Sequence, residues 1–270
     1  VTSHLGISAR PPHVSELYSE GLHHGTAAIE RGLMNRGGFQ TDQSLIRNET
    51  SAKFTNGFQL IQKNFSFEVS AHVNRIANYV FLKPAGSALT VRGYFPVFDY
   101  AQTDALLTGI DGLIHWDAGQ HLEYSGTFAY LYAKDLAHND VLTFIPPAQM
   151  EHALTWHSLI KKKHDFFFTV SVPVAFTQNR APVTVYPNDA AAYEGSRVFD
   201  FAPAPKGYVL LNTEVGITFP IKNRTLSVAL EGENLLNTSY RVYMNRLRYF
   251  ADEPGTNFML RIKYDFHSDE

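Results

Sequence analysis

Histidine is the residue type with the clearest capacity for chemistry in this chain, because the sequence holds 12 histidines and no cysteine. His13, His23 and His24 lie in one polar stretch near the start, where Arg10 and Glu16 add charge. Neutral imidazoles bind zinc, copper and iron, including haem iron. We therefore predict a ligand site at Arg10, His13, Glu16, His23 and His24, with His23 and His24 as metal ligands. The alternative stays open that these side chains are solvated or pair with one another.

No catalytic set accompanies these residues. The sequence contains no G-x-S-x-G, H-E-x-x-H or P-loop motif, and no spacing of Ser, His and Asp marks a triad. The absence of cysteine excludes disulfides and a cysteine-built zinc site. A formal net charge of −3 gives no argument for a nucleic-acid partner. We expect no enzymatic activity and no cofactor.

The elements that must position these residues are strands. Apolar and polar residues alternate with a period of two, which is the signature of a strand with two different faces. The clearest case lies near the C-terminus. One face there carries Phe258, Leu260, Ile262, Tyr264 and Phe266, and the other carries Asn257, Met259, Arg261, Lys263 and Asp265. A strand of this kind needs an apolar surrounding on one side only.

About ten such segments follow one another along the chain. They lie near residues 1–9, 45–62, 64–82, 94–117, 120–134, 149–161, 164–179, 207–220, 224–237 and 256–266. Several exceed the ~5–6 residues usual in globular sheets. They match the ~9–11 residues of a tilted strand that crosses a bilayer. The sequence therefore predicts an all-β, antiparallel transmembrane barrel.

The connections between these segments alternate in length. Short turns are expected at 62–64, 117–120, 161–164 and 220–224, and long loops at 10–44, 83–93, 135–148, 180–206 and 238–255. Short turns at one end and long loops at the other are typical of outer-membrane β-barrels. Charged residues make up only 18% of the chain and aromatic residues 13%. Few charges and many aromatic rings suit a protein that exposes apolar surface to lipid.

Four stretches go beyond this pattern. Residues 10–18 (RPPHVSELY), 48–51 (NETS), 232–240 (GENLLNTSY) and 246–257 (RLRYFADEPGTN) occur in this order. Together they resemble the motifs of TonB-dependent outer-membrane receptors. The histidines near the start are similar to those in loops of the metal- and haem-uptake branch. The ending at Tyr264 and Phe266 is similar to the aromatic terminus that the barrel-assembly machinery reads.

The resemblance implies a fold, a location and a set of partners. The family's barrel has 22 strands and encloses a plug domain, so residues 1–270 are expected to form the C-terminal part of the wall, without the plug. The implied location is the bacterial outer membrane, with Tyr264 and Phe266 anchoring the last strand among lipids. The implied function is active uptake of a scarce nutrient, such as an iron chelate, haem or another metal. The ligand would come from outside, and a TonB-type complex would supply energy through the plug.

Two alternatives from other classes stay open. A passive porin or adhesin barrel would share the alternation but lack the combination of N-L-L-N-x-x-Y with E-L-Y. A soluble all-β binding module would bury the apolar face of each strand in a protein core. The accessibility of that face decides between membrane and soluble proteins.

Overall fold

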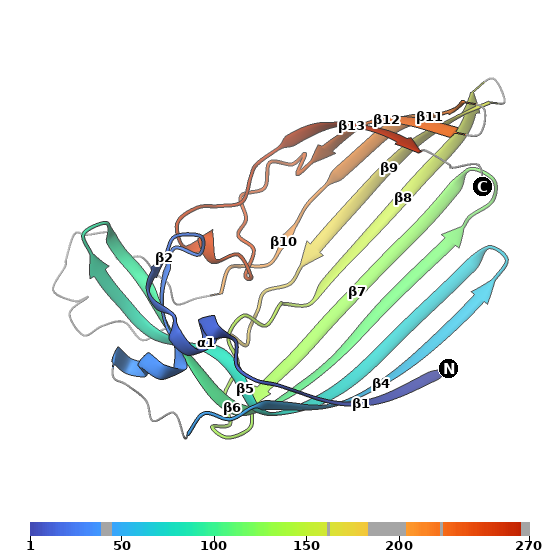
Figure 1. Cartoon of the computed structure of the whole chain (residues 1–270). Coiled ribbons are helices and arrows are strands. Elements are labelled where there is room, and N and C mark those ends of the chain that lie inside the picture. Colours follow the sequence, from blue (N-terminus) through green and yellow to red (C-terminus); the bar gives the residue numbers. More distant parts are fainter. Residues whose placement is uncertain (39–44, 161–162, 183–203, 222–223, 266–270) are drawn as a thin grey trace.

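The chain folds into a single curved β-sheet. The computed structural model describes residues 1–38, 45–160, 163–182, 204–221 and 224–265. Thirteen strands join one sheet, and ten of them follow each other as antiparallel neighbours. These ten are β1 (Thr2–Arg10), β4 (Glu49–Gln62), β5 (Phe65–Thr90), β6 (Gly93–Asp117), β7 (Leu122–Asp135), β8 (Gln149–Ile160), β9 (His164–Ala175), β11 (Asn212–Ile221), β12 (Arg224–Glu233) and β13 (Asn257–Asp265). Figure 1 shows them bending into an open trough.

The ten strands confirm the ten segments predicted from alternation. The sheet is open, because within the described residues β1 pairs only with β4 and β13 only with β12. Turns at 63–64 and 118–121 lie at one end of the sheet, which we call the short-turn end. Connections 11–48, 136–148 and 234–256 lie at the other, the long-loop end. The predicted asymmetry is therefore present at these five connections; the turns predicted at 161–164 and 220–224 and the loop predicted at 180–206 include residues outside the described part of the chain.

The register of the strands builds one continuous apolar face. Leu5 pairs with Phe54, which pairs with Val73 on the next strand. At the far edge Leu230 pairs with Leu260. The face extends over every main strand: it includes Leu5, Phe54, Phe58, Val73, Ile110, Trp116, Phe128, Leu154, Trp156, Phe168, Val215, Leu230, Leu260 and Ile262, all exposed. The opposite face, which we call the polar face, carries the alternating polar residues.

No second layer covers the apolar face in the described part of the chain, where all strands belong to the one sheet. Phe54 is 46% exposed and Leu260 67% exposed. Ten strands at a spacing of about 4.8 Å make this face about 45 Å wide, whereas soluble monomers rarely expose apolar patches beyond a few hundred Å². The structure does not pack these side chains as a soluble β-module would. No helix among the described residues is long and apolar enough to cross a membrane.

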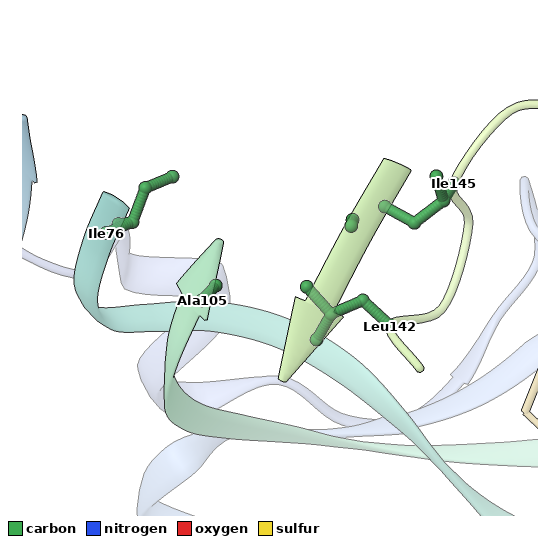
Figure 2. Packing of buried hydrophobic residues seen from close by; sticks show 5 residues of the cluster. Ile76, Ala105, Leu142 and Ile145 are labelled. Carbon is green, nitrogen blue, oxygen red and sulfur yellow. The ribbon is translucent and has the colours of Figure 1, made fainter. Parts of the chain in front are cut away.

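The packed core lies at the long-loop end, on the side of the polar face. Ile76, Ala105 and Ala133 on adjacent strands contact Leu142 and Ile145 from the connection 136–148. Figure 2 shows Leu142 and Ile145 reaching from this connection toward the strands. Leu142 is only 1% exposed. A single sheet has no core of its own, so the folded connections supply the core here.

The expected long loop at 83–93 is wrong, because β5 runs to Thr90 and β6 starts at Gly93. Pro84 and Gly86 lie at a register shift between Pro84 and Ser87, where Gly86 has a φ of 90°. Bulges accept a proline and a left-handed glycine within a strand. The two strands therefore continue as a hairpin beyond the rest of the sheet (Figure 1).

The long connection expected at 10–44 is present, but its described residues hold four elements. They are α1 (Val14–Tyr18), β2 (Glu20–His23), β3 (Ala28–Arg31) and η1 (Leu33–Gly38). β3 pairs in parallel with β6, from Ile29 opposite Val97 to Arg31 opposite Asp99. The pairing of β6 with β7 ends at Ala105. Residues 97–99 of β6 therefore have one edge that β7 does not cover, and β3 pairs with this edge. Such a pairing between distant segments leaves no periodic signal in the sequence.

Candidate functional site

Arg10 and Glu16, two predicted ligand residues, bind each other. Arg10 ends β1, and its Nη1 and Nη2 donate to the two carboxylate oxygens of Glu16 at 2.9 and 3.1 Å. Its Nη2 also donates to Glu49 at 2.9 Å, and Glu49 lies directly opposite in register. Glu49 accepts a further hydrogen bond from the backbone N–H of Val80. The three charged side chains thus fix the start of α1 to the sheet, and their part in ligand binding stays a prediction.

His13 caps the short helix that follows. Its Nδ1 accepts from the backbone N–H of Ser15 at 3.3 Å, and its own backbone N–H donates to Glu16 at 2.7 Å. These two bonds form a capping box, which satisfies N–H groups at a helix start. One ring nitrogen of His13 is therefore engaged within the protein. This structural role was not predicted.

His23 and His24 lie at the end of β2 and in the turn after it. The Nδ1 of His24 is 3.3 Å from Nη1 of Arg92, on the tip of the β5–β6 hairpin. A permanent guanidinium charge at this distance opposes a metal cation on the same ring. Among the residues that the structure describes, no group of three or more His, Asp or Glu side chains could hold a metal ion. A metal site at His23 and His24 stays a prediction, and within the described ranges no third His, Asp or Glu side chain completes one.

A buried ion pair joins the first and last connections of the chain. Glu30 on β3 is 4% exposed, and Arg246 of η4 (Arg246–Tyr249) donates to its carboxylate. The hydroxyl of Tyr100 donates to Glu30 at 3.3 Å. These contacts bring together residues 216 positions apart in the chain. They hold the long-loop end in one arrangement.

Arg248 strengthens the same region. Its guanidinium lies 4.3 Å from the ring centroid of Tyr249 and 4.7 Å from that of Tyr243. It donates to the backbone oxygen of Tyr243 at 2.6 Å and to the hydroxyl of Tyr249 at 2.8 Å. Burial lowers the pKa of Arg248. The aromatic rings compensate this desolvation through cation–π contact.

A cavity of about 750 Å³ opens between β9, β10 (Tyr208–Val209) and the last connection. Its lining includes Phe176, Lys206, Tyr208, Tyr240 and Arg241. The ring centroids of Tyr208 and Tyr240 are 4.5 Å apart, and Phe176 is 45% exposed. Burial raises the pKa of both tyrosines. Aromatic faces and the ammonium group of Lys206 in one cavity can bind a planar or anionic ligand by stacking and charge.

Asp252 also lines this cavity and holds the guanidinium of Arg241 in place. The Nε of Arg241 donates to Asp252 at 2.5 Å, and the hydroxyl of Ser239 donates to the same carboxylate at 2.6 Å. The hydrogen bond from Ser239, and then that from Arg241, lower the pKa of Asp252. The sequence drew attention to Tyr240 only as part of the N-L-L-N-x-x-Y resemblance. Nothing in the alternation indicated that it meets Tyr208.

Two further cavities continue over the polar face. One of about 380 Å³ shares Tyr208 and Ala175 with the first cavity. The next, of about 340 Å³, shares Asp111, Ala129 and Gln149 with the second. The three adjoin one another from the long-loop end toward β5. The polar face therefore carries these cavities. The first of them, lined by Phe176, Tyr208 and Tyr240, lies at the long-loop end, and we call it the aromatic cavity.

Comparison with known proteins shows the fold. No family model and no curated protein matches the chain. Among solved structures, "Copper transporter OprC" matches with a TM-score of 0.72 and 16% identity, covering 98% of this chain and 36% of that one. The siderophore receptor PirA from Acinetobacter baumannii gives a TM-score of 0.61 at 15% identity, covering 98% and 38%. The ferric enterobactin receptor PfeA from Pseudomonas aeruginosa, as its G324V mutant, gives 0.57 at 16%, covering 95% and 36%.

The chain has the fold of a receptor β-barrel wall. The predicted fold class, an antiparallel transmembrane barrel seen in part, is confirmed by these matches and by the open sheet. At 15–16% identity the likeness extends to the fold alone. The chain spans 36–38% of the length of these proteins. By name they are a transporter and receptors.

Proposed function

We propose that the chain forms part of a bacterial outer-membrane receptor that takes up a scarce nutrient with TonB-type energy coupling. The observation that carries this proposal is the apolar face, which stays exposed across ten strands. Lipid is the surrounding in which such a face is stable. The resemblance of residues 232–240 and 10–18 to receptor motifs supports a receptor rather than a passive barrel.

The aromatic cavity is the ligand site that we propose. It lies at the long-loop end, which faces outward in barrels of this kind. Tyr208 and Tyr240 offer two aromatic rings tilted against each other, while Lys206 offers positive charge and Arg241 is paired with Asp252. This chemistry suits an anionic metal chelate with flat aromatic groups. The neighbours named as siderophore receptors support the same ligand class. His23 and His24 form a separate proposed site for a bare metal ion or haem.

The proposed partners follow from the same assignment. A TonB-type complex would act through a plug domain, and the barrel-assembly machinery would read the end of the last strand. Tyr264 is on β13, where the guanidinium of Arg224 lies 6.0 Å from its ring centroid. Phe266, the other predicted anchor, lies outside the described residues. Truncation before Tyr264 should prevent insertion into outer-membrane vesicles if these residues have the proposed role.

Fractionation tests the membrane assignment. The chain should remain with outer membranes after a carbonate wash and dissolve only in detergent. Recovery of the folded chain in the soluble fraction would refute the membrane assignment. A charge on the apolar face provides the matched test. Leu260→Arg should reduce membrane insertion, whereas Met259→Arg on the polar face of the same strand should not.

Ligand binding is tested separately on the chain folded in detergent, with ferric enterobactin as the probe. Tyr240→Ala should weaken the affinity for ferric enterobactin, measured by quenching of protein fluorescence, by up to about tenfold, because one aromatic ring of the cavity is lost. Tyr18→Ala is the control, since Tyr18 is 54% exposed and outside the cavity. Equal affinity of both variants would refute the cavity as the site. His23→Ala with His24→Ala, titrated with Zn²⁺ and haem, tests the other site.

A further inference from the structure

The apolar face has a sharp upper limit on the three central strands β5, β6 and β7. Its positions carry no charged side chain over residues 65–73 of β5, 108–116 of β6 and 122–132 of β7. Each of these stretches is about as long as the ~9–11 residues with which a tilted strand crosses a bilayer. Tyr130 and Tyr132 end the stretch on β7, and tyrosine rings favour the level of the lipid head groups. The uncharged stretch thus has the length of one bilayer crossing.

Two cations follow directly after this stretch, at the long-loop end. Arg75 of β5 pairs with Leu106 of β6, and Leu106 pairs in turn with Lys134 of β7. Both cations continue the alternation of the apolar face, because they lie two residues beyond Val73 and Tyr132. Their Cα atoms are two strand spacings apart, which is about 10 Å. Two long cationic side chains therefore flank one leucine on the side of the sheet that carries the apolar face.

A third cation reaches the same part of β7 from a distant segment. Arg180 follows β9, and its guanidinium carbon lies 4.0 Å from the ring centroid of Tyr132. Its Nη2 donates to the backbone oxygen of Ala133 at 3.5 Å. Because Tyr132 belongs to the apolar face, its ring places this third charge two positions from Lys134 along the strand. We call Arg75, Lys134 and Arg180 the basic patch.

The protein itself does not neutralise the basic patch. Within the described ranges, no ion pair includes Arg75, Lys134 or Arg180. Asp104 is the next residue of β6 on the same side of the sheet, and its carboxylate accepts a hydrogen bond from the backbone N–H of Asn78 at 3.2 Å. Three cations therefore lie near one carboxylate, and the patch keeps a positive formal charge.

The position of the basic patch favours a lipid over a soluble anion. Arg75 is exposed, and Lys134 and Arg180 are half-buried, so their charged groups remain accessible from outside the sheet. Long cationic side chains at the border of an apolar surface cover it with their stems and extend their charges to the head groups. A free anion at this open surface competes with water, whereas a lipid also buries its acyl chains against the apolar face. The patch and the apolar face below it therefore fit the two parts of one lipid molecule.

We propose that the basic patch binds the phosphate group of an anionic lipid in the outer leaflet of the membrane. Guanidinium and ammonium groups donate charge-assisted hydrogen bonds to phosphate oxygens, and a guanidinium can donate two in parallel. Leu106, between Arg75 and Lys134, contacts the upper part of the acyl chains. The long-loop end faces outward in barrels of this kind, which places the lipid in the outer leaflet. The proposal rests on the membrane assignment made above, but not on the uptake function or its ligand.

Native mass spectrometry of the full chain in neutral detergent tests the basic patch, with phosphatidylglycerol and phosphatidylcholine as probes. Phosphatidylglycerol should bind more tightly, because phosphatidylcholine carries its own positive charge beside the phosphate. Arg75→Gln with Lys134→Gln should weaken phosphatidylglycerol binding about 10–30-fold, since each cation near a lipid surface contributes roughly fivefold. Lys53→Gln is the matched control, because Lys53 is exposed on the polar face, where it pairs with Asn74. Equal affinities of the double variant and the control would overturn the proposal.

A second measurement uses the unmodified chain and does not depend on the folding of a variant. The preference for phosphatidylglycerol should shrink as salt rises from about 0.05 to 0.5 M, because salt screens exposed charges. Equal affinity for the two lipids at low salt contradicts the proposal. Displacement of phosphatidylglycerol by inorganic phosphate at the same concentration also contradicts it, since a free anion is then the ligand. Recovery of the folded chain in the soluble fraction refutes the membrane assignment itself, whereas a membrane-bound chain without lipid preference refutes only the basic patch.

Discussion

The two ends of the sheet are stabilised in different ways. At the long-loop end, connections fold back over the polar face and bury Leu142, Phe98 and Glu30. At the short-turn end, the strands meet in tight turns, and the side chains of His115, Glu123 and His157 remain accessible to water. The long-loop end therefore has a protein core and buried charge, whereas the short-turn end depends on the sheet and on screened ionic contacts. Substitutions should therefore lower the free energy of unfolding much more at the long-loop end than at the short-turn end.

Breaking the buried ion pair between Glu30 and Arg246 should lower the free energy of unfolding more than any other substitution considered. Arg246→Ala leaves Glu30 without its cation in a nearly water-free site, which costs about 3–5 kcal/mol when such pairs are broken. The expected result is a lower free energy of unfolding in urea and release of the last connection to proteolysis. Arg224→Ala, in a partly exposed position at the other end, is the control. A loss below about 1 kcal/mol for Arg246→Ala would remove the proposed contrast.

The apolar core should give the next effect. Leu142→Ala removes a fully buried side chain between connection 136–148 and the sheet, and should destabilise the chain by about 2–4 kcal/mol. Leu159→Ala is the matched substitution at the short-turn end, where the side chain is 65% exposed. It should change stability by less than about 0.5 kcal/mol. Similar losses for both variants would mean that the core does not distinguish the two ends.

Removing the ion pairs of Arg261 on the polar face should reduce the free energy of unfolding by less. Arg261→Gln removes contacts to Glu214 and Glu231 from a side chain that is 54% exposed. Solvent screening limits the loss to about 0–1 kcal/mol. The expected loss should shrink further in 1 M salt, which is the measurement that separates a screened contact from a buried one. An effect as large as that of Arg246→Ala would contradict the comparison.

The smallest effect concerns Asp252 at the mouth of the aromatic cavity. Hydrogen bonds from Ser239 and Arg241 lower its pKa, so its carboxylate binds a proton less readily in the folded chain than in the unfolded chain. The resulting stabilisation is present above the ordinary aspartate pKa of about 3.9 and is lost as the pH falls through the lowered value. Asp252→Asn should reduce the acid dependence of Tm below pH 4. Unchanged acid dependence would show that the contacts do not hold in solution.

The sequence by itself determined the strands and their two faces. Alternation is a local property, since each residue faces the side opposite to its neighbour, and any window of ten residues reveals it. For this reason the ten strands, the exposed apolar face and the position of most connections could be predicted. Tyr264 could likewise be placed on the last strand.

Only the tertiary structure decided what happens between distant segments. Arg10 pairs with Glu49, Glu30 pairs with Arg246, β3 covers a free edge of β6, and the ring of Tyr208 contacts that of Tyr240. Each contact depends on the curvature of the sheet and on connections folding back, neither of which has a period in the sequence. The predicted ligand residues therefore turned out to be partly internal partners of one another, while the aromatic cavity was visible only after folding.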